Sequence, residues 1–275
     1  MLVDVAAEVI ANTRLSADYN VLALSAPAVA RAADPGQFVM VKPTTGLDPL
    51  LRRPFSIFEI LRDGRGEVTG LSLLNKRVGI GTARLFDARP GQSIGCLGPL
   101  GQPFVPVDPP EEAWMVAGGV GLAPFATLAE ALRAHHTPTT LFYGGRAATD
   151  LFYEAFFERL GVQLILTTED GSRGERGRVT GPLERALAAH DPARPITIYA
   201  CGPTPMMRAV ATLGARANRP VFVSLEPVMG CGTGGCYSCV VPVRRGLGSH
   251  FVRSCLEGPV FDASTVVWDA LSAAH

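Results

Sequence analysis

Short runs of alternating apolar and polar residues fill the first hundred positions of the chain. Alternation with a period of two predicts strands that bury one face, and Pro-Gly or Asp-Gly pairs at 35–36, 63–64 and 90–91 predict turns between them. One helix is expected at about residues 81–88. Many short strands with few helices predict an antiparallel β-barrel. The expected strands are residues 3–10, 19–25, 37–42, 55–59, 68–74 and 93–97.

The pattern changes after a proline-rich segment at residues 106–110, which has the composition of an interdomain linker. Beyond it, apolar runs alternate with helical periods, the order typical of a doubly wound parallel α/β sheet. We expect strands at 113–117, 139–144, 163–168 and 196–200, and helices at 125–134, 151–160, 182–189 and 205–217. The predicted domains are a barrel over 1–106, an α/β nucleotide domain over 111–223 and a small C-terminal module over 224–275.

Composition narrows the class of protein. The 275 residues are 47% hydrophobic and 18% charged, which is typical of packed globular domains. Lys plus Arg and Asp plus Glu both total 25, so no global field favours nucleic acid or an anionic membrane. No apolar run approaches the ~20 residues that span a bilayer, and the N-terminus does not resemble a signal peptide. Six cysteines fit a reducing compartment, and we expect a cytoplasmic protein.

Cysteine spacing is the strongest chemical signal in the chain. Cys231, Cys236 and Cys239 follow a C-x4-C-x2-C pattern, and Cys255 lies one segment further on. This is the spacing of the plant-type ferredoxin [2Fe–2S] site, where four thiolates converge on two bridged irons. A short loop supplies three ligands only by curling around the cluster. The glycines between the cysteines permit such a loop because they adopt positive φ freely: these are Gly232, Gly234 and Gly235.

Other uses of four cysteines stay open at this point. A structural zinc site usually joins two C-x2–4-C knuckles, and here only Cys236 and Cys239 have that form. Disulfides are typical of secreted chains, and nothing in the sequence indicates secretion. The spacing favours the iron–sulfur cluster over zinc, and zinc over disulfides.

Two groups in the predicted barrel suit a phosphate-bearing cofactor. Arg52 and Arg53 precede Pro54-Phe55-Ser56, and arginine offers a planar fork of donors that fits a pyrophosphate. Gly79-Ile-Gly81-Thr82 leads into the expected helix, where free N–H groups favour anions. Alone, the first group reads as an ordinary surface pair of arginines, and the second is also a weak signal. Their occurrence together in one barrel strengthens both.

Two turns of the predicted α/β domain follow strands and face its expected ligand edge. The first, Gly118-Gly119-Val-Gly121-Leu-Ala-Pro124, lacks the third glycine of the usual dinucleotide fingerprint, so a plain strand–helix turn competes equally with a nucleotide site. The second, Cys201-Gly202-Pro203, places a small thiol where a flat ring has room to approach. A buried structural cysteine is the commoner fate of this residue type.

These motifs, taken in order, resemble the ferredoxin–NAD(P) reductase superfamily, in which a flavin barrel precedes a nicotinamide domain. The C-terminal module from Ser224 to Phe261 looks like that of the electron-transfer subunit of class 1B dihydroorotate dehydrogenase, and the resemblance covers essentially the whole chain. The motifs that carry it are Arg53-Pro-Phe-Ser56, Gly79-x-Gly81-Thr82, Gly118-Gly-x-Gly121-x-Ala-Pro124, Cys201-Gly-Pro-x-Pro-Met206 and the four cysteines.

The resemblance implies a set of cofactor contacts. For FAD they are Arg53, Pro54, Phe55 and Ser56 at the ring and pyrophosphate, Leu74, Asn75 and Lys76 on a second flavin-lining strand, and Gly81 and Thr82 at the pyrophosphate. For NAD(H) they are Gly119, Gly121, Cys201, Gly202 and Pro203, and for the [2Fe–2S] cluster Cys231, Cys236, Cys239 and Cys255. Some relatives carry an aromatic residue near 75–76, which this sequence lacks. No catalytic residue is expected, because hydride transfer needs no protein acid or base.

Coenzyme choice depends on the loop after the third strand of the α/β domain. Glu169 and Asp170 could accept hydrogen bonds from an adenosine ribose and repel a 2′-phosphate, whereas Arg173 and Arg176 would attract one. The acids favour NAD over NADP. The alternative is that the charged side chains of this loop are simply solvated and bind no coenzyme.

The resemblance implies an electron relay. Electrons from dihydroorotate on a separate FMN-containing catalytic subunit would pass through the [2Fe–2S] cluster and FAD to NAD⁺ in pyrimidine biosynthesis, within a heterotetramer of two subunits of each kind and without nucleic acid or membrane. A flavin is needed between the nicotinamide and the cluster, because it exchanges both hydrides and single electrons. The alternative is the reductase subunit of a sulfide dehydrogenase or of an NADH-dependent ferredoxin:NADP oxidoreductase. Related subunits of that type can depart from four cysteine ligands, so the full set favours dihydroorotate. A non-enzymatic zinc-stapled interaction module is the remote alternative, since it leaves the flavin and nicotinamide motifs unexplained.

Overall fold

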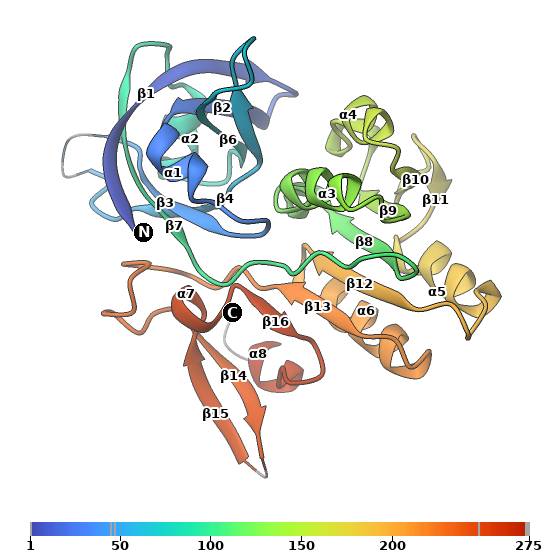
Figure 1. Ribbon diagram of the computed structural model, residues 1–275. Coiled ribbons are helices and arrows are strands. Elements are labelled where there is room, and N and C mark those ends of the chain that lie inside the picture. The colour runs from blue at the N-terminus through green and yellow to red at the C-terminus, as the bar shows by residue number, and fades with distance from the viewer. Residues whose placement is uncertain (1, 45, 47, 247, 273–275) are drawn as a thin grey trace. The chain divides into compact units, whose positions relative to one another are not determined.

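The computed structural model describes residues 2–44, 46, 48–246 and 248–272 (Figure 1). The chain forms two compact units. The first comprises Met1–Pro103, Pro227–Val240 and Arg253–Pro259, and the second comprises Phe104–Glu226, Val241–Val252 and Val260–His275. Each unit has its own hydrophobic core. Among the described residues, no helix has the length and apolar character needed to cross a membrane.

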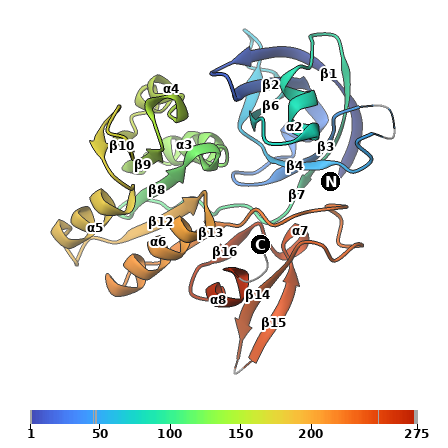
Figure 2. The same ribbon diagram turned by 180° about the vertical axis from the view of Figure 1, so that it is seen from behind.

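The first unit contains a seven-stranded antiparallel sheet that curls into a barrel, as the sequence predicts (Figures 1 and 2). The strand order is β4-β3-β7-β1-β2-β6-β5. Its elements are β1 (Val3–Arg14), β2 (Tyr19–Ser25), α1 (Pro27–Arg31), β3 (Phe38–Lys42), β4 (Arg53–Ser56), β5 (Glu59–Arg62), β6 (Val68–Lys76), α2 (Ile80–Phe86) and β7 (Ser93–Leu100). Inward-facing side chains from β1, β2, β3, β6 and β7 form the barrel core.

The strand expected at residues 55–59 is two strands in the structure. Between β4 and β5, Ile57 and Phe58 are 1% and 0% exposed. The N–H of Ile57 donates to the Gln37 carbonyl, beside β3, and that of Phe58 donates to the Ser72 carbonyl, on β6 near the other end of the strand order. These two bonds connect the β3 end of the sheet to β6. The buried pair therefore closes the barrel instead of continuing one strand.

The second unit contains the predicted doubly wound sheet. Its order is β11-β10-β9-β8-β12-β13-β16, and its pairs are parallel except for β13 with β16. The strands are β8 (Glu112–Gly118), β9 (Thr139–Gly145), β10 (Gln163–Thr168), β11 (Glu175–Arg176), β12 (Ile196–Cys201), β13 (Val221–Ser224) and β16 (Val260–Asp262). The helices are η1 (Gly119–Leu122), α3 (Phe125–Ala134), η2 (Ala148–Asp150), α4 (Glu154–Arg159), α5 (Thr180–Ala189) and α6 (Thr204–Arg216).

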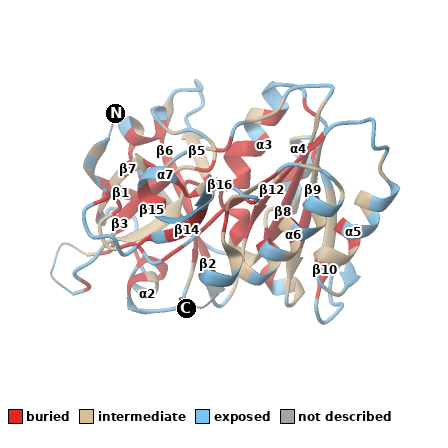
Figure 3. Cartoon of the chain, turned by 90° about the horizontal axis from the view of Figure 1, so that it is seen from below, coloured by how far each residue is buried: buried red, intermediate tan, exposed pale blue. Residues whose placement is uncertain are grey.

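Helices cover both faces of this sheet. In Figures 1 and 2, α3 and α4 lie on one face, and α5 and α6 lie on the other. The central strands β8 and β12 are buried along most of their length, which Figure 3 shows in red. Burial on both faces explains why these strands read as continuous apolar runs. The ladder places the ends of β8 and β12 side by side, with Ala117 opposite Cys201.

The C-terminal module predicted over residues 224–275 contributes segments to both units. It contains the hairpin β14 (Val240–Arg245) and β15 (Gly248–Arg253), then α7 (Ser254–Glu257), β16 and α8 (Trp268–Ser272). Val241, Val243 and Val252 belong to the core of the second unit. Cys239 and Cys255 pack instead with barrel residues such as Met40. The module is shared between the units because neighbouring side chains along it are buried in different cores.

Candidate functional site

The four cysteines of the predicted cluster site lie together in the first unit, in two pairs. The Cys231 and Cys236 side chains interact with each other, as do those of Cys239 and Cys255. All four thiols are free of disulfides. A [2Fe–2S] cluster takes two protein ligands on each iron, so two pairs of thiols match its donor set.

A single tetrahedral ion fits this arrangement less well. Within the described residues, no three His, Cys, Asp or Glu side chains converge closely enough to hold one metal ion. A structural zinc site needs four ligands around one point. Two pairs of thiolates are the ligand arrangement of a binuclear [2Fe–2S] cluster.

Two of the three loop glycines adopt the positive φ expected from the sequence. Gly232 has φ +76° and Gly234 has φ +85°, whereas Gly235 is not among the positive-φ glycines. A Cβ on Gly232 would collide with Met40, and one on Gly234 would lie 2.6 Å from Leu256. Only glycine fits these two positions without strain.

Polar contacts hold the rest of the loop around the thiols. The N–H of Thr233 donates to the Cys231 sulfur at 3.4 Å, and the Ser238 hydroxyl lies 3.1 Å from the Cys236 sulfur. Arg253 donates to the Gly234 carbonyl at 2.8 Å. Donors aimed at sulfur stabilise negative charge there, as a thiolate ligand requires.

The thiol environments differ between the two pairs. Burial raises the pKa of Cys231, but hydrogen bonds from the backbone of Thr233 and Cys236 outweigh it and bring the pKa to about 6. Hydrogen bonds from Ser238 lower the pKa of Cys236. Burial raises the pKa of Cys255 to about 12, with a further contribution from Cys239. The charge of a bound metal would deprotonate Cys255.

Strand β3 supports the cysteine loop. Its side chains alternate between two sides: Val39 and Val41 enter the barrel core, while Phe38 and Met40 pack with Met229, Cys239 and Cys255. Cover on both sides explains the unbroken apolar run Phe38-Val-Met-Val. On the neighbouring strand, Pro54 lies opposite Met40. The strand that supports the cysteine loop is therefore the neighbour of the strand that carries the Arg53–Ser56 motif.

The two arginines before Pro54 have different environments. Arg52 donates to the Asp4 carboxylate at 2.9 Å and to the Met40 carbonyl, which ties β4 to its neighbours. Arg53 donates to the Leu51 and Arg52 carbonyls. A Cβ on Gly81 would lie 3.0 Å from the Arg53 Nε. The structure therefore brings Arg53 and Gly81 into contact, as a shared pyrophosphate site requires.

The remaining predicted flavin residues differ in accessibility. Pro54, Phe55 and Ser56 are partly buried along β4, and Phe55 also packs on the barrel core. Leu74 and Asn75 are 4% and 0% exposed, so their side chains do not line an open surface. At Leu74 and Asn75 only the backbone remains for direct flavin contact, whereas the side chain of Lys76 is partly exposed.

Helix α2 is closed at its start by Thr82. The Thr82 hydroxyl accepts the N–H groups of Val78 and Gly79 at 2.8 and 2.9 Å and donates to the Gly79 carbonyl. These bonds, which form the half of a capping box that the N3 side chain supplies, commit the hydroxyl within the chain. A phosphate contact at Thr82 would therefore come from its backbone N–H, because the first helical N–H groups lack intrahelical acceptors.

The predicted nicotinamide residues meet at the carboxyl ends of β8 and β12. Gly119 has φ +55°, and a Cβ on Gly121 would collide with the Cys201 carbonyl. Gly202 has φ +146°, and a Cβ on Gly118 would lie 2.8 Å from Pro203. Glycine is required here by the close approach of two backbones. Such an edge is where doubly wound sheets bind nucleotides.

Cys201 itself is 0% exposed, which agrees with the buried structural cysteine left open by the sequence. Its thiol donates to the Glu226 carboxylate at 3.9 Å. Burial, and then the Glu226 charge, raises the pKa of Cys201 well above its ordinary value. Glu226 was not among the predicted site residues. Its position follows from β13, which ends beside Cys201 at Ser224 and carries the chain to this acid.

The geometry of the acidic loop after β10 favours NAD over NADP. Asp170 accepts hydrogen bonds from the N–H and hydroxyl of Ser172, which shape the loop. Arg173 is paired with Glu154 at 2.6 Å, so this cation is partly neutralised. Glu169 is exposed. One of the two arginines that would favour a 2′-phosphate is thus committed elsewhere.

An antiparallel barrel, a parallel nucleotide sheet and paired cysteines define a reductase-type oxidoreductase with an iron–sulfur domain. Two family models match the chain: "Oxidoreductase NAD-binding domain" over residues 115–212 and "Iron-sulfur cluster binding domain of dihydroorotate dehydrogenase B" over residues 226–267. The first match lies within the second unit, whereas the second match covers segments of both units.

Curated relatives cover nearly the whole chain. Proteins called "Dihydroorotate dehydrogenase B (NAD(+)), electron transfer subunit" from Desulforamulus reducens and Geobacillus kaustophilus are 36% and 39% identical, covering 96% and 94% of this chain and 98% and 96% of theirs. The chain belongs to the family of dihydroorotate dehydrogenase B (NAD⁺) electron transfer subunits.

Solved structures share the fold. A structure of an NADH-dependent reduced ferredoxin–NADP oxidoreductase is 27% identical, with a TM-score of 0.84 over 98% of this chain and 92% of that one. A ferredoxin reductase of carbazole 1,9a-dioxygenase has a TM-score of 0.68 at 22% identity over 81% of this chain and 69% of that one, which shows the fold alone. The predicted barrel, parallel sheet and iron–sulfur region are thus confirmed.

Proposed function

We propose that this chain is the electron-transfer subunit of an NAD-dependent dihydroorotate dehydrogenase. It would carry electrons from an FMN-containing catalytic partner to NAD⁺ in pyrimidine biosynthesis. The bound groups would supply the redox chemistry: a nicotinamide exchanges hydride, an iron–sulfur cluster exchanges single electrons, and FAD exchanges both. The protein would bind and orient these groups and would supply no acid or base of its own.

The observation that carries this proposal is the pairing of the four cysteines, of which Cys239 and Cys255 pack on β3. Cys231 with Cys236 and Cys239 with Cys255 match a [2Fe–2S] donor set. The same strand adjoins the Arg53–Ser56 motif through β4. One unit of the chain therefore contains both the proposed cluster ligands and the proposed flavin residues.

The flavin site is proposed at β4 and α2. The Arg53 guanidinium and the backbone of Gly81 and Thr82 would bind the pyrophosphate, while Pro54, Phe55 and Ser56 would border the ring. From β6 we retain Lys76 and the backbone of Leu74 and Asn75. The contact between Gly81 and Arg53 supports this assignment because a side chain at 81 would fill the space beside the guanidinium.

The nicotinamide site is proposed at the turn of Gly119 and Gly121 and the facing turn of Cys201, Gly202 and Pro203. Two glycine-dependent backbones that approach each other at a strand edge support it. NAD is proposed over NADP from the exposed Glu169. The Cys201 thiol would pack behind this site, since its side chain is buried.

The partner is proposed from the family. We infer a heterotetramer of two electron-transfer and two FMN-containing subunits, with contacts near the cysteine loop, and no nucleic acid or membrane. A cytoplasmic location remains a prediction from cysteine usage.

An anaerobic NADH titration of the purified chain tests the proposal, followed by visible absorption and low-temperature EPR spectroscopy. We expect a bound flavin to bleach and a reduced [2Fe–2S] signal to appear. If only the flavin bleaches, reduction by dithionite distinguishes a missing cluster from one of low potential. A colourless chain that stays unresponsive after reconstitution with FAD, iron and sulfide would refute the proposal.

A second candidate is the reductase subunit of a ferredoxin–NADP oxidoreductase. The observation favouring it is the 27% identity and TM-score of 0.84 to such a structure over nearly the whole chain. Co-purification separates the two: an FMN-containing partner and dihydroorotate:NAD⁺ activity support the first function. A larger iron–sulfur flavoprotein partner with NADP-dependent activity supports the second.

A further inference from the structure

Three asparagines form a polar chain inside the barrel of the first unit. Asn12, Asn20 and Asn75 come from β1, β2 and β6. Asn20 and Asn75 are 0% exposed. Burying an amide is costly unless its hydrogen-bonding groups find partners. The proposed function gives no role to Asn12 or Asn20, and only backbone contact at Asn75.

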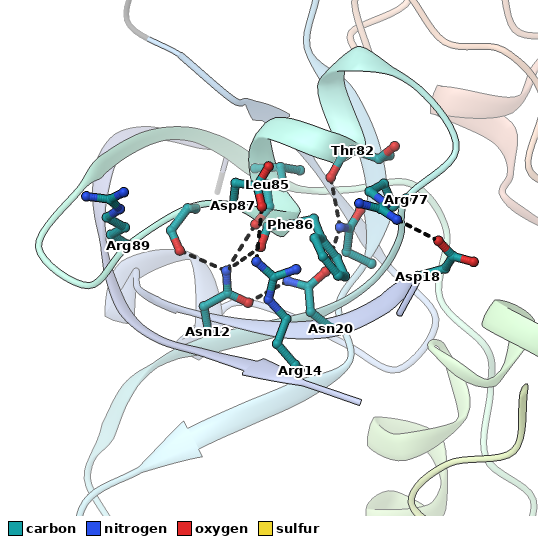
Figure 4. Close-up of polar contacts among 12 residues, drawn as sticks. Asn12, Arg14, Asp18, Asn20, Arg77, Thr82, Leu85, Phe86, Asp87 and Arg89 are labelled. Carbon is teal, nitrogen blue, oxygen red and sulfur yellow. Dashed lines mark hydrogen bonds and ion pairs between the residues drawn. The ribbon is translucent and has the colours of Figure 1, made fainter. Parts of the chain in front are cut away.

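The amides join one another and helix α2 in an unbroken series (Figure 4). Asn75 Nδ2 donates to the Thr82 carbonyl at 3.0 Å and to Asn20 Oδ1 at 2.7 Å. Asn20 Nδ2 donates to Asn12 Oδ1 at 2.6 Å. Asn12 Nδ2 donates to carbonyls at the end of α2: those of Phe86 at 3.0 Å, Ala88 at 2.8 Å and Leu85 at 3.3 Å.

The two ends of the series fix the orientation of its amides. Its two ends are backbone carbonyls, which only accept hydrogen bonds, so the amide nitrogens of Asn12 and Asn75 must face α2. The oxygen of Asn12 must then face Asn20, whose nitrogen donates to it. A side chain that lacks an amide donor breaks the series at any of the three positions. The three asparagines are therefore interdependent.

The series holds α2 at both of its ends. Thr82 is in the first turn of the helix, and Phe86 is its last residue. Gly81 lies between the N-cap Gly79 and Thr82, and it is buried against the Arg53 guanidinium. A shift of α2 relative to β6 would therefore change the distance between Gly81 and Arg53. These are the two groups assigned above to the pyrophosphate.

A second set of contacts holds the same helix from outside. Arg14 pairs with Asp87 at 3.0 Å and lies over the Phe86 ring, and Arg77, which pairs with Asp18 at 3.1 Å, lies 4.9 Å from the centroid of the same ring (Figure 4). The Asp87 side chain is 71% exposed. Exposed ion pairs contribute little to stability. The buried asparagines, rather than these pairs, should fix the position of α2.

We propose that Asn12, Asn20 and Asn75 are positioning residues for the flavin nucleotide, which they serve by fixing α2 and the contact between Gly81 and Arg53. This inference rests on the proposed function, because it takes FAD as the ligand of that contact. It also reassigns Asn75. The resemblance implied a flavin-lining residue, whereas the buried side chain acts through Thr82.

The test uses the full-length chain with FAD as the probe. Asn20→Leu keeps a similar size but removes the central amide donor. In case this variant folds poorly, Asn12→Ala removes the donor that reaches the end of α2, at a half-buried position. Asp87→Asn is the matched control, because it removes an exposed ion pair on the same helix. The FAD dissociation constant and dissociation rate are measured by the recovery of flavin fluorescence. Hydrogen exchange of residues 80–86 is measured without FAD.

We expect about tenfold weaker FAD binding in Asn20→Leu and Asn12→Ala, mostly through faster dissociation, which corresponds to ~1.4 kcal/mol. Exchange at 80–86 should accelerate in both variants, and Asp87→Asn should match the wild type. Lower thermal stability with wild-type FAD dissociation and exchange would indicate a merely structural role and overturn the inference. Failure of the wild-type chain itself to bind FAD would overturn the proposed function and the inference with it. Wild-type binding with unaffected variants would overturn the inference alone.

Discussion

The cysteine loop of the first unit and the Cys201 turn of the second use the same side chain in opposite environments. Cys231 lies in a polar loop whose backbone donors bring its pKa to about 6. Cys201 is buried at a strand end beside Glu226, and its pKa is raised. The first environment favours a thiolate that can bind metal, and the second keeps a neutral thiol that packs. Residue type alone therefore does not assign a cysteine; spacing and neighbours do.

The largest expected effect comes from removing one thiol of the cysteine loop. Cys236→Ser should abolish the [2Fe–2S] cluster, because one iron loses a thiolate, while NADH-dependent reduction of a dye through the flavin persists. Cys201→Ala should leave the iron content unchanged. Iron and sulfide analysis with EPR checks both variants. A Cys236→Ser chain that keeps its cluster and passes electrons to the partner at the normal rate would contradict the assigned ligand set.

Thiol reactivity sharpens the comparison directly. In the metal-free chain at pH 7, Cys231 should be alkylated by iodoacetamide about a hundredfold faster than Cys201, since the thiolate is the reactive form and Cys201 is also buried. The Cys231 rate should be flat above its pKa of about 6 and fall as the pH drops through that value, because the thiolate becomes protonated. Peptide mass spectrometry follows each site. Equal rates at the two cysteines would show that their environments do not differ as described.

Glycine substitutions test whether the backbone of the loop shapes the cluster site. Gly232→Ala forces a side chain into positive φ and against Met40, at a cost of about 1–3 kcal/mol. The iron content after reconstitution should fall about tenfold. Gly235→Ala is the matched control, since a Cβ there has nothing within 4 Å. Similar losses in both variants would indicate general sensitivity of the loop rather than the strain at Gly232.

The two arginines before Pro54 give the smallest effect. Arg53→Ala should weaken FAD binding several-fold by removing a charge-assisted contact to the pyrophosphate. Arg52→Ala should leave FAD binding close to wild type and lower stability by about 0.2–1 kcal/mol, since it loses a partly exposed pair with Asp4. Flavin fluorescence and thermal unfolding separate these results. A larger FAD loss in Arg52→Ala would reverse the assignment.

Local patterns in the sequence predict much of this structure. The C-x4-C-x2-C spacing and its glycines are readable because three of the ligands lie within nine consecutive residues. The parallel sheet is readable because its central strands are continuous apolar runs. Both signals depend on neighbours in the chain, which a single sequence records.

Contacts between distant segments could not be predicted in this way. Nothing local distinguishes Cys239, buried with Met40, from Val241, two residues later, which is buried in the other unit. Asn75 was predicted to line the flavin because its strand does so in the family, but its partner Asn20 is 55 positions away. The contact between Cys201 and Glu226 depends on the pairing of β12 with β13. Such features need the assembled fold.

The path of the chain constrains how this protein can be made. The polypeptide passes from one unit to the other five times, and the first unit includes residues as late as Pro259. During synthesis the strands of the barrel emerge well before the fourth thiol, at Cys255. A cluster with all four ligands must therefore form after residue 255 has been translated. For the same reason, no single cut separates the first unit, with its barrel and four cysteines, from the second.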